Sequence, residues 1–233
     1  MRRVLLVAAL AGSIAAATAA PAGATDECNG LQVCVPVTGP WVVVPVGRSV
    51  PRPHVEYLLS CPRGYIVGGL DAELSRPGID LSFEGKLGAP VNPGVTTSRG
   101  VVFVATYVGR EAGGPPSFRP HVGCMPASGG GRVLTSLRVV PPGRPAIRRV
   151  FALPLHPGSQ AVSKRCAAGE QLISATHATG YYMVDPPGAR LISSVRVGQR
   201  VHAGRVSIRV RSGRAIFTAR TVVQFSLVCA GGQ

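Results

Sequence analysis

Short runs of alternating or β-branched apolar residues recur along almost the whole chain and are separated by turn residues. With 30 Gly and 21 Pro spread over 233 residues, few windows could hold a helix of about ten residues, because both residue types destabilise helix interiors. Period-two alternation bounded by turn residues is typical of strands in sandwiches and barrels. The pattern therefore predicts an all-β protein with almost no helix.

The same pattern predicts about seven strands in each half of the chain, which is enough for two packed sheets per half. In the first half the predicted strands are Trp41–Val46, Val55–Ser60, Tyr65–Leu74, Asp80–Leu87, Val101–Gly109, Arg119–Gly123 and Val133–Val140. In the second half they are Val150–Leu155, Ala161–Cys166, Gln171–His177, Leu191–Val197, Val206–Arg211, Ala215–Thr221 and Val223–Cys229.

Four of the six cysteines mark out two similar stretches of chain. Cys61 and Cys124 are 63 residues apart, as are Cys166 and Cys229, and SCPRGYIVGGL around the first cysteine is similar to RCAAGEQLISA around the third. This indicates a duplicated, disulfide-closed unit. Aligning the aromatic strands places Ser98–Val108 over Ser212–Val222, so that the equal spacing would result from compensating insertions.

Six cysteines allow 15 pairings, and the sequence alone does not choose among them. A duplication does choose, because matched positions in two copies should pair within each copy. The chain lacks the close-set cysteine pairs of zinc sites, so we expect no metal. The predicted disulfides are Cys61–Cys124, Cys166–Cys229 and, by remainder, Cys28–Cys34.

Together these features predict two tandem, diverged β-sandwich units of jelly-roll or immunoglobulin-like type, each closed by one disulfide. Residues 141–147 (PPGRPAI) contain the Pro-rich joint between the units. The expected division is a signal peptide (1–24), an N-terminal segment with a small disulfide loop (25–40), a first unit (41–140), the linker (141–147) and a second unit (148–233).

The first 24 residues have the composition of a secretory signal peptide. Arg2 and Arg3 precede an apolar run, Val4–Ala17, and Ala22-Gly23-Ala24 is a small-residue cleavage site. The apolar run is too short for a stable membrane span. We therefore expect a cleaved, secreted protein, extracellular or associated with the cell wall, without integral membrane association.

The segment Cys61-Pro62-Arg63-Gly64-Tyr65-Ile66-Val67-Gly68-Gly69, followed by a distant cysteine, resembles a module of uncharacterised secreted proteins from high-GC Gram-positive bacteria. The resemblance covers the first unit and implies a disulfide-closed β-sandwich without any catalytic residue. Physically, Gly64 suits a tight turn, and Gly68-Gly69 allows another backbone to approach closely.

No catalytic centre and no cofactor site emerge from the sequence. The five histidines are scattered, and motifs such as G-x-S-x-G and H-E-x-x-H are absent. Asp71 and Glu73 would share one face of a strand, where outward polar residues of half-buried strands are expected. One alternative stays open: an exported enzyme or enzyme inhibitor that uses the Pro-rich loop Gly109–Pro120.

Basic residues are concentrated in the second half of the chain. Residues 25–130 carry eight basic and eight acidic residues, whereas residues 131–233 carry fifteen basic residues against only Glu170 and Asp185. Such an asymmetry points to a polyanionic partner for the second unit.

Strand periodicity places these charges on one face. In RVSIRVR, Val206, Ile208 and Val210 should face the core while the arginines face outward, and a hairpin around Ser212-Gly213 would add the next strand. Without aromatic residues on this face, nucleic acid is an unlikely ligand, and an anionic cell-envelope polymer or acidic glycan is expected. The predicted binding residues are Arg196, Arg200, Arg205, Arg209, Arg211, Arg214 and Arg220.

Overall fold

The computed structural model describes residues 25–85, 98–110, 113–127 and 146–231. Within these ranges the chain is all-β, as predicted, and its two helices, α1 (Ala189–Ser193) and the 3-10 helix η1 (Arg214–Thr218), are both short. No helix in the described part of the chain is long and apolar enough to span a membrane. The expected signal peptide, the predicted strand Val133–Val140 and most of the expected linker lie outside the described residues.

In the first half, two strands organise the pairing. β7 pairs with β1, β2 and β4, and β6 pairs with β3 and β5, in every case antiparallel. The strands are β1 (Val35–Thr38), β2 (Trp41–Val43), β3 (His54–Ser60), β4 (Tyr65–Leu74), β5 (Ile79–Glu84), β6 (Gly100–Tyr107) and β7 (Ser117–Pro126).

In the second half, two strands again organise the pairing. β13 pairs with β8 and β10, and β12 pairs with β9 and β11, again antiparallel. The strands are β8 (Ile147–Pro154), β9 (Gly158–Arg165), β10 (Glu170–Tyr182), β11 (Val195–His202), β12 (Arg205–Ser212) and β13 (Arg220–Gly231).

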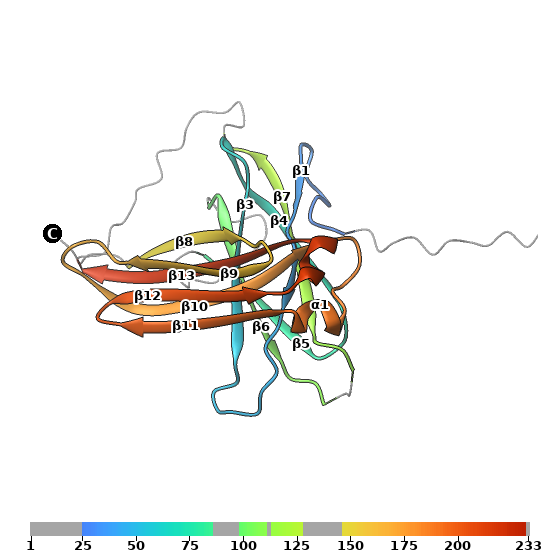
Figure 1. The fold of residues 1–233 in the computed structure, drawn as a ribbon. Helices are drawn as coiled ribbons and strands as arrows, with labels where there is room; N and C mark the ends of the chain where they lie inside the picture. The colour runs from blue at the N-terminus through green and yellow to red at the C-terminus, as the bar shows by residue number, and fades with distance from the viewer. Residues whose placement is uncertain (1–24, 86–97, 111–112, 128–145, 232–233) are drawn as a thin grey trace, which may run out of the picture.

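The two halves are joined through one sheet. Trp41 and Val42 of β2 pair with Tyr181 and Gly180 of β10, so that strands of both halves form a single seven-stranded sheet. In Figure 1 the strands of the second half, coloured yellow to red, run across those of the first half, coloured blue to green. Each half also has its own three-stranded sheet, β3-β6-β5 in the first and β9-β12-β11 in the second.

Each half has a separate apolar core between its sheets. In the first core Phe103 of β6 stacks on Phe118 of β7, with ring centroids 6.3 Å apart. In the second core the buried side chains of β12 lie in one cluster with those of β13, among them Phe225 and Leu227. This layout is consistent with a β-sandwich in each half.

All three predicted disulfides are confirmed. Cys28 pairs with Cys34, and the two longer bridges have similar Cα–Cα distances, 5.6 Å for Cys61–Cys124 and 5.8 Å for Cys166–Cys229.

The bridges sit beside matching irregularities in the strand pairing. In β4 the register against β7 shifts between Val67 and Gly69, with Val67 opposite Cys124. In β10 the register against β13 shifts between Leu172 and Ser174, with Leu172 opposite Cys229. Leu172, Ser174 and Cys229 lie 105 positions after Val67, Gly69 and Cys124, respectively. The same interval separates the bounds of β6 from those of β12.

This interval corrects the alignment of the aromatic strands. At this interval β6 aligns with β12 rather than with Ser212–Val222, and the alignment needs no compensating insertions between the bridged cysteines and these strands. Phe103 is fully buried in a strand, whereas Phe217, which the alignment placed over it, is 76% exposed in η1. The predicted strand Ala215–Thr221 is therefore wrong over most of its length.

The expected close approach at Gly69 is also confirmed. A Cβ atom at this position would lie 1.8 Å from the carbonyl oxygen of Glu27, and one at Gly123 of β7 would lie 1.9 Å from the same oxygen. The backbone at Glu27, directly before the Cys28–Cys34 loop, therefore packs against β4 and β7. This contact is possible only because both positions lack a side chain.

Candidate polyanion-binding face

The central strand of the β9-β12-β11 sheet has the alternation that its sequence predicts. Val206, Ile208 and Val210 are almost completely buried, with at most 1% of each residue exposed. Arg205, Arg209 and Arg211 occupy the intervening positions and are exposed. Because successive strand residues point to opposite faces, these three guanidinium groups project from the outer face of the sheet.

The strand β11 adds two of the predicted arginines to this face. Arg196 lies opposite Arg211, and Arg200 lies opposite Ser207. Directly opposed residues in an antiparallel pair place their side chains on the same side of the sheet. The structure therefore brings Arg196 and Arg200 together with the arginines of β12, as predicted.

The strand β9 contributes an arginine that the sequence analysis missed. Arg165 lies opposite Arg205, on the other edge of the sheet. Its strand was predicted, but nothing in its local sequence indicates that β9 pairs with β12 in this register. We refer to the exposed outer surface of this sheet as the arginine face, which comprises Arg165, Arg196, Arg200, Arg205, Arg209 and Arg211.

Positive charge on the arginine face is not neutralised by neighbouring acids. The strands β9, β11 and β12 contain no Asp or Glu, and among the described residues none of the six arginines forms an ion pair. Arg196 opposite Arg211 and Arg165 opposite Arg205 are like-charge pairs, which destabilise a sheet. An external anion would relieve both repulsions.

Two hollows lie on this face. The larger has a volume of ≈ 550 Å³ and is lined by arginines of all three strands, with Gly198 and Ser207 between them. Gly198 lies opposite Arg209 and has no side chain to fill this space. The Ser207 hydroxyl lies 3.0 Å from that of Ser163 on β9, so hydroxyl groups accompany the guanidinium groups here.

The second hollow lies farther along the same strands. It has a volume of ≈ 360 Å³ and is lined by Arg196 and Arg211 together with serine and glycine residues. Since Arg211 and Arg209 both belong to β12, the two hollows follow one line along the central strand. This arrangement suits several anionic groups in succession rather than one isolated anion.

Two of the predicted arginines do not join the arginine face. The predicted hairpin around Ser212-Gly213 is wrong, because Gly213 donates its N–H to the Ser194 carbonyl and the chain then enters η1. Arg214 begins η1 and lines a different hollow together with Arg190. Arg220 belongs to β13 in the seven-stranded sheet, where its guanidinium group lies 4.8 Å from the ring centroid of Tyr182.

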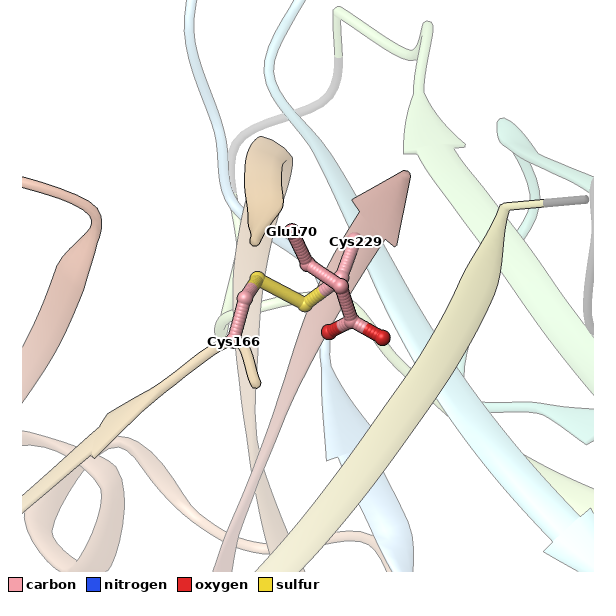
Figure 2. A group of neighbouring side chains, drawn as sticks. All are labelled: Cys166, Glu170 and Cys229. Carbon is pink, nitrogen blue, oxygen red and sulfur yellow. A yellow bond between two sulfur atoms is a disulfide. The ribbon is translucent and has the colours of Figure 1, made fainter. Parts of the chain in front are cut away.

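Cys166, Glu170 and Cys229 form a cluster in which the disulfide leaves no free thiolate for a metal ion. Within the described residues this is the one group whose potential ligand atoms lie close together, and Figure 2 shows the sulfur atoms joined to each other. The Glu170 carboxylate accepts hydrogen bonds from both terminal nitrogens of Arg149, at 2.6 and 2.8 Å, and from the Ala167 N–H. These bonds lower the pKa of the Glu170 carboxyl. The cluster is therefore structural.

The acidic residues of β4 also have a structural role. Asp71 accepts a 2.8 Å hydrogen bond from the Asp26 N–H, and Glu73 lies 2.9 Å from the imidazole of buried His121. On its other side His121 lies 3.7 Å from the carboxylate of Glu27. These contacts hold the N-terminal segment over β4 and β7.

No protein family, curated protein or solved structure matches this chain. The function of the arginine face is therefore inferred from its own charges and geometry.

Proposed function

We propose that this is an exported, non-catalytic interaction protein that binds anionic cell-envelope polymers or acidic glycans through the arginine face. One observation carries the proposal: six arginines share the outer face of a three-stranded sheet that contains no acid, and two pairs of them are directly opposed. Ordinary protein surfaces intersperse charges of both signs. A surface that carries charge of only one sign, and whose like-charge pairs destabilise the sheet, is expected where a polyanion binds.

Export is supported by the cysteines. The described structure pairs all six of them in disulfides, and such bridges persist in oxidising, extracellular-type environments. Cleavage of the first 24 residues as a signal peptide completes this part of the proposal.

We also propose that the two halves are tandem copies of one β-sandwich. The proposal is supported by the 105-residue interval, which relates the disulfides, the register shifts beside them and the strands β6 and β12. In this view the first copy has kept a balanced charge while the second has acquired the arginine face. A resemblance of Cys61–Gly69 to secreted modules of high-GC Gram-positive bacteria remains compatible with such a history.

Carbohydrate or polymer anions fit the face better than nucleic acid does. Proteins that bind single-stranded nucleic acid usually stack its bases on aromatic side chains, and β9, β11 and β12 contain no Phe, Tyr or Trp. Phosphate, sulfate or carboxylate groups along a polymer require only charge and hydrogen-bond donors, which the arginines supply.

The test is binding of the oxidised full-length mature protein to dextran sulfate and to polyglutamate. Replacing Arg209 and Arg211 with Ser should weaken binding at least tenfold without unfolding the domain, because both side chains point away from the core. The matched control replaces Arg190 and Arg214 with Ser, which removes the same charge from the same half at another place. Equal losses in both double variants would show that net charge, rather than the arginine face, governs binding.

Salt dependence gives the second criterion. Screening shortens from ~10 Å at 0.1 M to ~3 Å at 1 M salt, so affinity should fall steeply between these concentrations. Binding that is independent of salt would contradict an attraction between guanidinium groups and surface anions.

A further inference from the structure

A separate hollow lies in the first half of the molecule, where the segment between β2 and β3 meets the end of β6. Its volume is ≈ 620 Å³, within the range of about 300–1,000 Å³ that is usual for small-molecule sites. Three exposed arginines line it: Arg48 and Arg52 before β3, and Arg110 after β6. It belongs to the half whose net charge is balanced, so an excess of basic residues does not explain it.

Among the described residues, the three guanidinium groups have no acidic counterpart at this place. None of the described residues that line the hollow is Asp or Glu, and in the described part of the chain no ion pair involves Arg48, Arg52 or Arg110. Three like charges around one concave surface repel one another, and an anion bound between them would remove that repulsion.

Tyr107 provides an independent indication of a ligand. This residue is only 7% exposed, and its hydroxyl group has no hydrogen-bond partner, although it lines the hollow. Leaving a buried hydroxyl without a partner costs about 1–3 kcal/mol. A Phe ring at this position would bury the same apolar surface without this cost.

Gly109 allows the backbone to pass close to this hydroxyl. A Cβ atom at position 109 would lie 2.5 Å from the Tyr107 oxygen, which is shorter than any non-bonded carbon–oxygen contact. Any other residue here would push the phenol ring aside or cover its hydroxyl. Among the described residues, the hollow therefore combines three guanidinium groups that form no ion pair with a buried phenol hydroxyl that has no hydrogen-bond partner.

We propose that this hollow binds the phosphate group of a small phosphorylated ligand. A phosphate monoester carries a charge of about −1.5 to −2 and three acceptor oxygens, which matches three arginines and a phenol better than a carboxylate does. Arg guanidinium groups bind phosphate oxygens in pairs, and the Tyr107 hydroxyl donates to a further oxygen. Since the hollow is larger than one phosphate group, the rest of the ligand contacts the apolar side chains of Val46 and Val108.

The experiment uses phenyl phosphate as the probe and titration calorimetry of the oxidised mature protein. All titrations are carried out in the Arg209→Ser/Arg211→Ser background, so that the arginine face contributes little. Replacing Arg48 and Arg52 with Ser should weaken binding at least tenfold, and Tyr107→Phe should weaken it about tenfold, as expected for a hydrogen bond to a charged group. Arg63→Ser, an exposed arginine elsewhere in the first half, should leave affinity unchanged.

Stability measurements distinguish a binding role from a structural one. Without ligand, Tyr107→Phe should be at least as stable as the parent protein, because the hydroxyl makes no bond that would be lost and its removal abolishes the cost of burying it without a partner. With phenyl phosphate, the parent should gain thermal stability by mass action, and the Arg48→Ser/Arg52→Ser variant should not.

Several results would overturn the proposal. Unchanged affinity in the Arg48→Ser/Arg52→Ser variant would remove the site, and so would an equal loss in Arg63→Ser. Benzoate binding as tightly as phenyl phosphate would exclude phosphate as the preferred group. Destabilisation of the ligand-free protein by Tyr107→Phe would show that the hydroxyl has a structural partner. None of these results bears on polymer binding by the arginine face.

Discussion

Arg196 on β11 lies directly opposite Arg211 on β12, with both side chains on the outer face of the sheet. Like charges in this position destabilise a sheet by about 0.2–1 kcal/mol. We therefore expect Arg211→Gln to raise the free energy of unfolding by about this amount at low salt. The same substitution should weaken binding to dextran sulfate.

Denaturant unfolding at low and high salt checks this prediction. The gain in stability should shrink at 1 M salt, because screening acts within about 3 Å there. Arg190→Gln on α1 serves as the control, since no other arginine is paired opposite it in a sheet. Loss of stability in Arg211→Gln at low salt would contradict the predicted repulsion.

Strand periodicity was sufficient to predict which side chains of β12 face the core, because a central strand with one face on an apolar core alternates apolar and polar residues. The register between neighbouring strands was not predictable to the same extent. The pairing of Arg165 with Arg205 depends on which strand lies beside β12, and that is decided by contacts of the whole sandwich rather than by the sequence of β9.

The segment Arg214–Ala219 shows why a short pattern can mislead. Its apolar residues fit a strand with period two, but Ile216 and Ala219 are the buried ones, and their spacing of three residues is that of a 3-10 turn. Over so few residues the two periods cannot be separated. The predicted position of Arg214 was wrong for this reason. The disulfides were predictable because the similarity of the two cysteine-bounded stretches supplied a constraint beyond local sequence.

Acid should weaken the second half through Glu170. Hydrogen bonds from Arg149, and then from the Ala167 N–H, hold the pKa of this carboxyl below its ordinary value. A lowered folded-state pKa stabilises the fold above the unfolded-state value of about 4.3, and this contribution is lost as the pH falls through the folded value. Glu170→Gln should therefore remove part of the loss of stability below about pH 4.3, while Glu84→Gln, for which no ion pair is found among the described residues, should not. Identical acid-unfolding curves for Glu170→Gln and the parent would contradict the prediction.

Gly69 should be essential for the attachment of the N-terminal segment. In Gly69→Ala the new methyl group would overlap the Glu27 carbonyl oxygen, so we expect the Cys28–Cys34 loop to leave β4 and β7. Hydrogen exchange and limited proteolysis should then increase at residues 25–34 while the strands stay protected. Gly188→Ala is the matched control, because a Cβ atom there has nothing within 4 Å and the residue has an ordinary negative φ of −71°. Unchanged protection of residues 25–34 in Gly69→Ala would show that the contact is not needed.

Gln224 of β13 is one of the polar links between the two halves, beside the β2–β10 pairing and the contacts of Glu56 on β3 with Arg148 and Thr176. Its side-chain oxygen accepts a 2.6 Å hydrogen bond from the Leu58 N–H, and its side-chain nitrogen donates to the Leu58 carbonyl at 3.0 Å. Leu58 lies on β3, at the edge of its sheet, so these backbone groups depend on Gln224 for partners.

Gln224→Ala leaves both of these groups unpaired in a partly buried place, at a cost of about 1–3 kcal/mol. Because the loss falls on the contact between the halves, we expect two separate unfolding transitions in calorimetry where the parent shows one. Gln171→Ala on β10 removes a similar side chain from an exposed position and should change neither the number of transitions nor their midpoints. A single transition at the parent's temperature in Gln224→Ala would mean that the backbone pairing of β2 with β10 and the contacts of Glu56 are enough to hold the halves together.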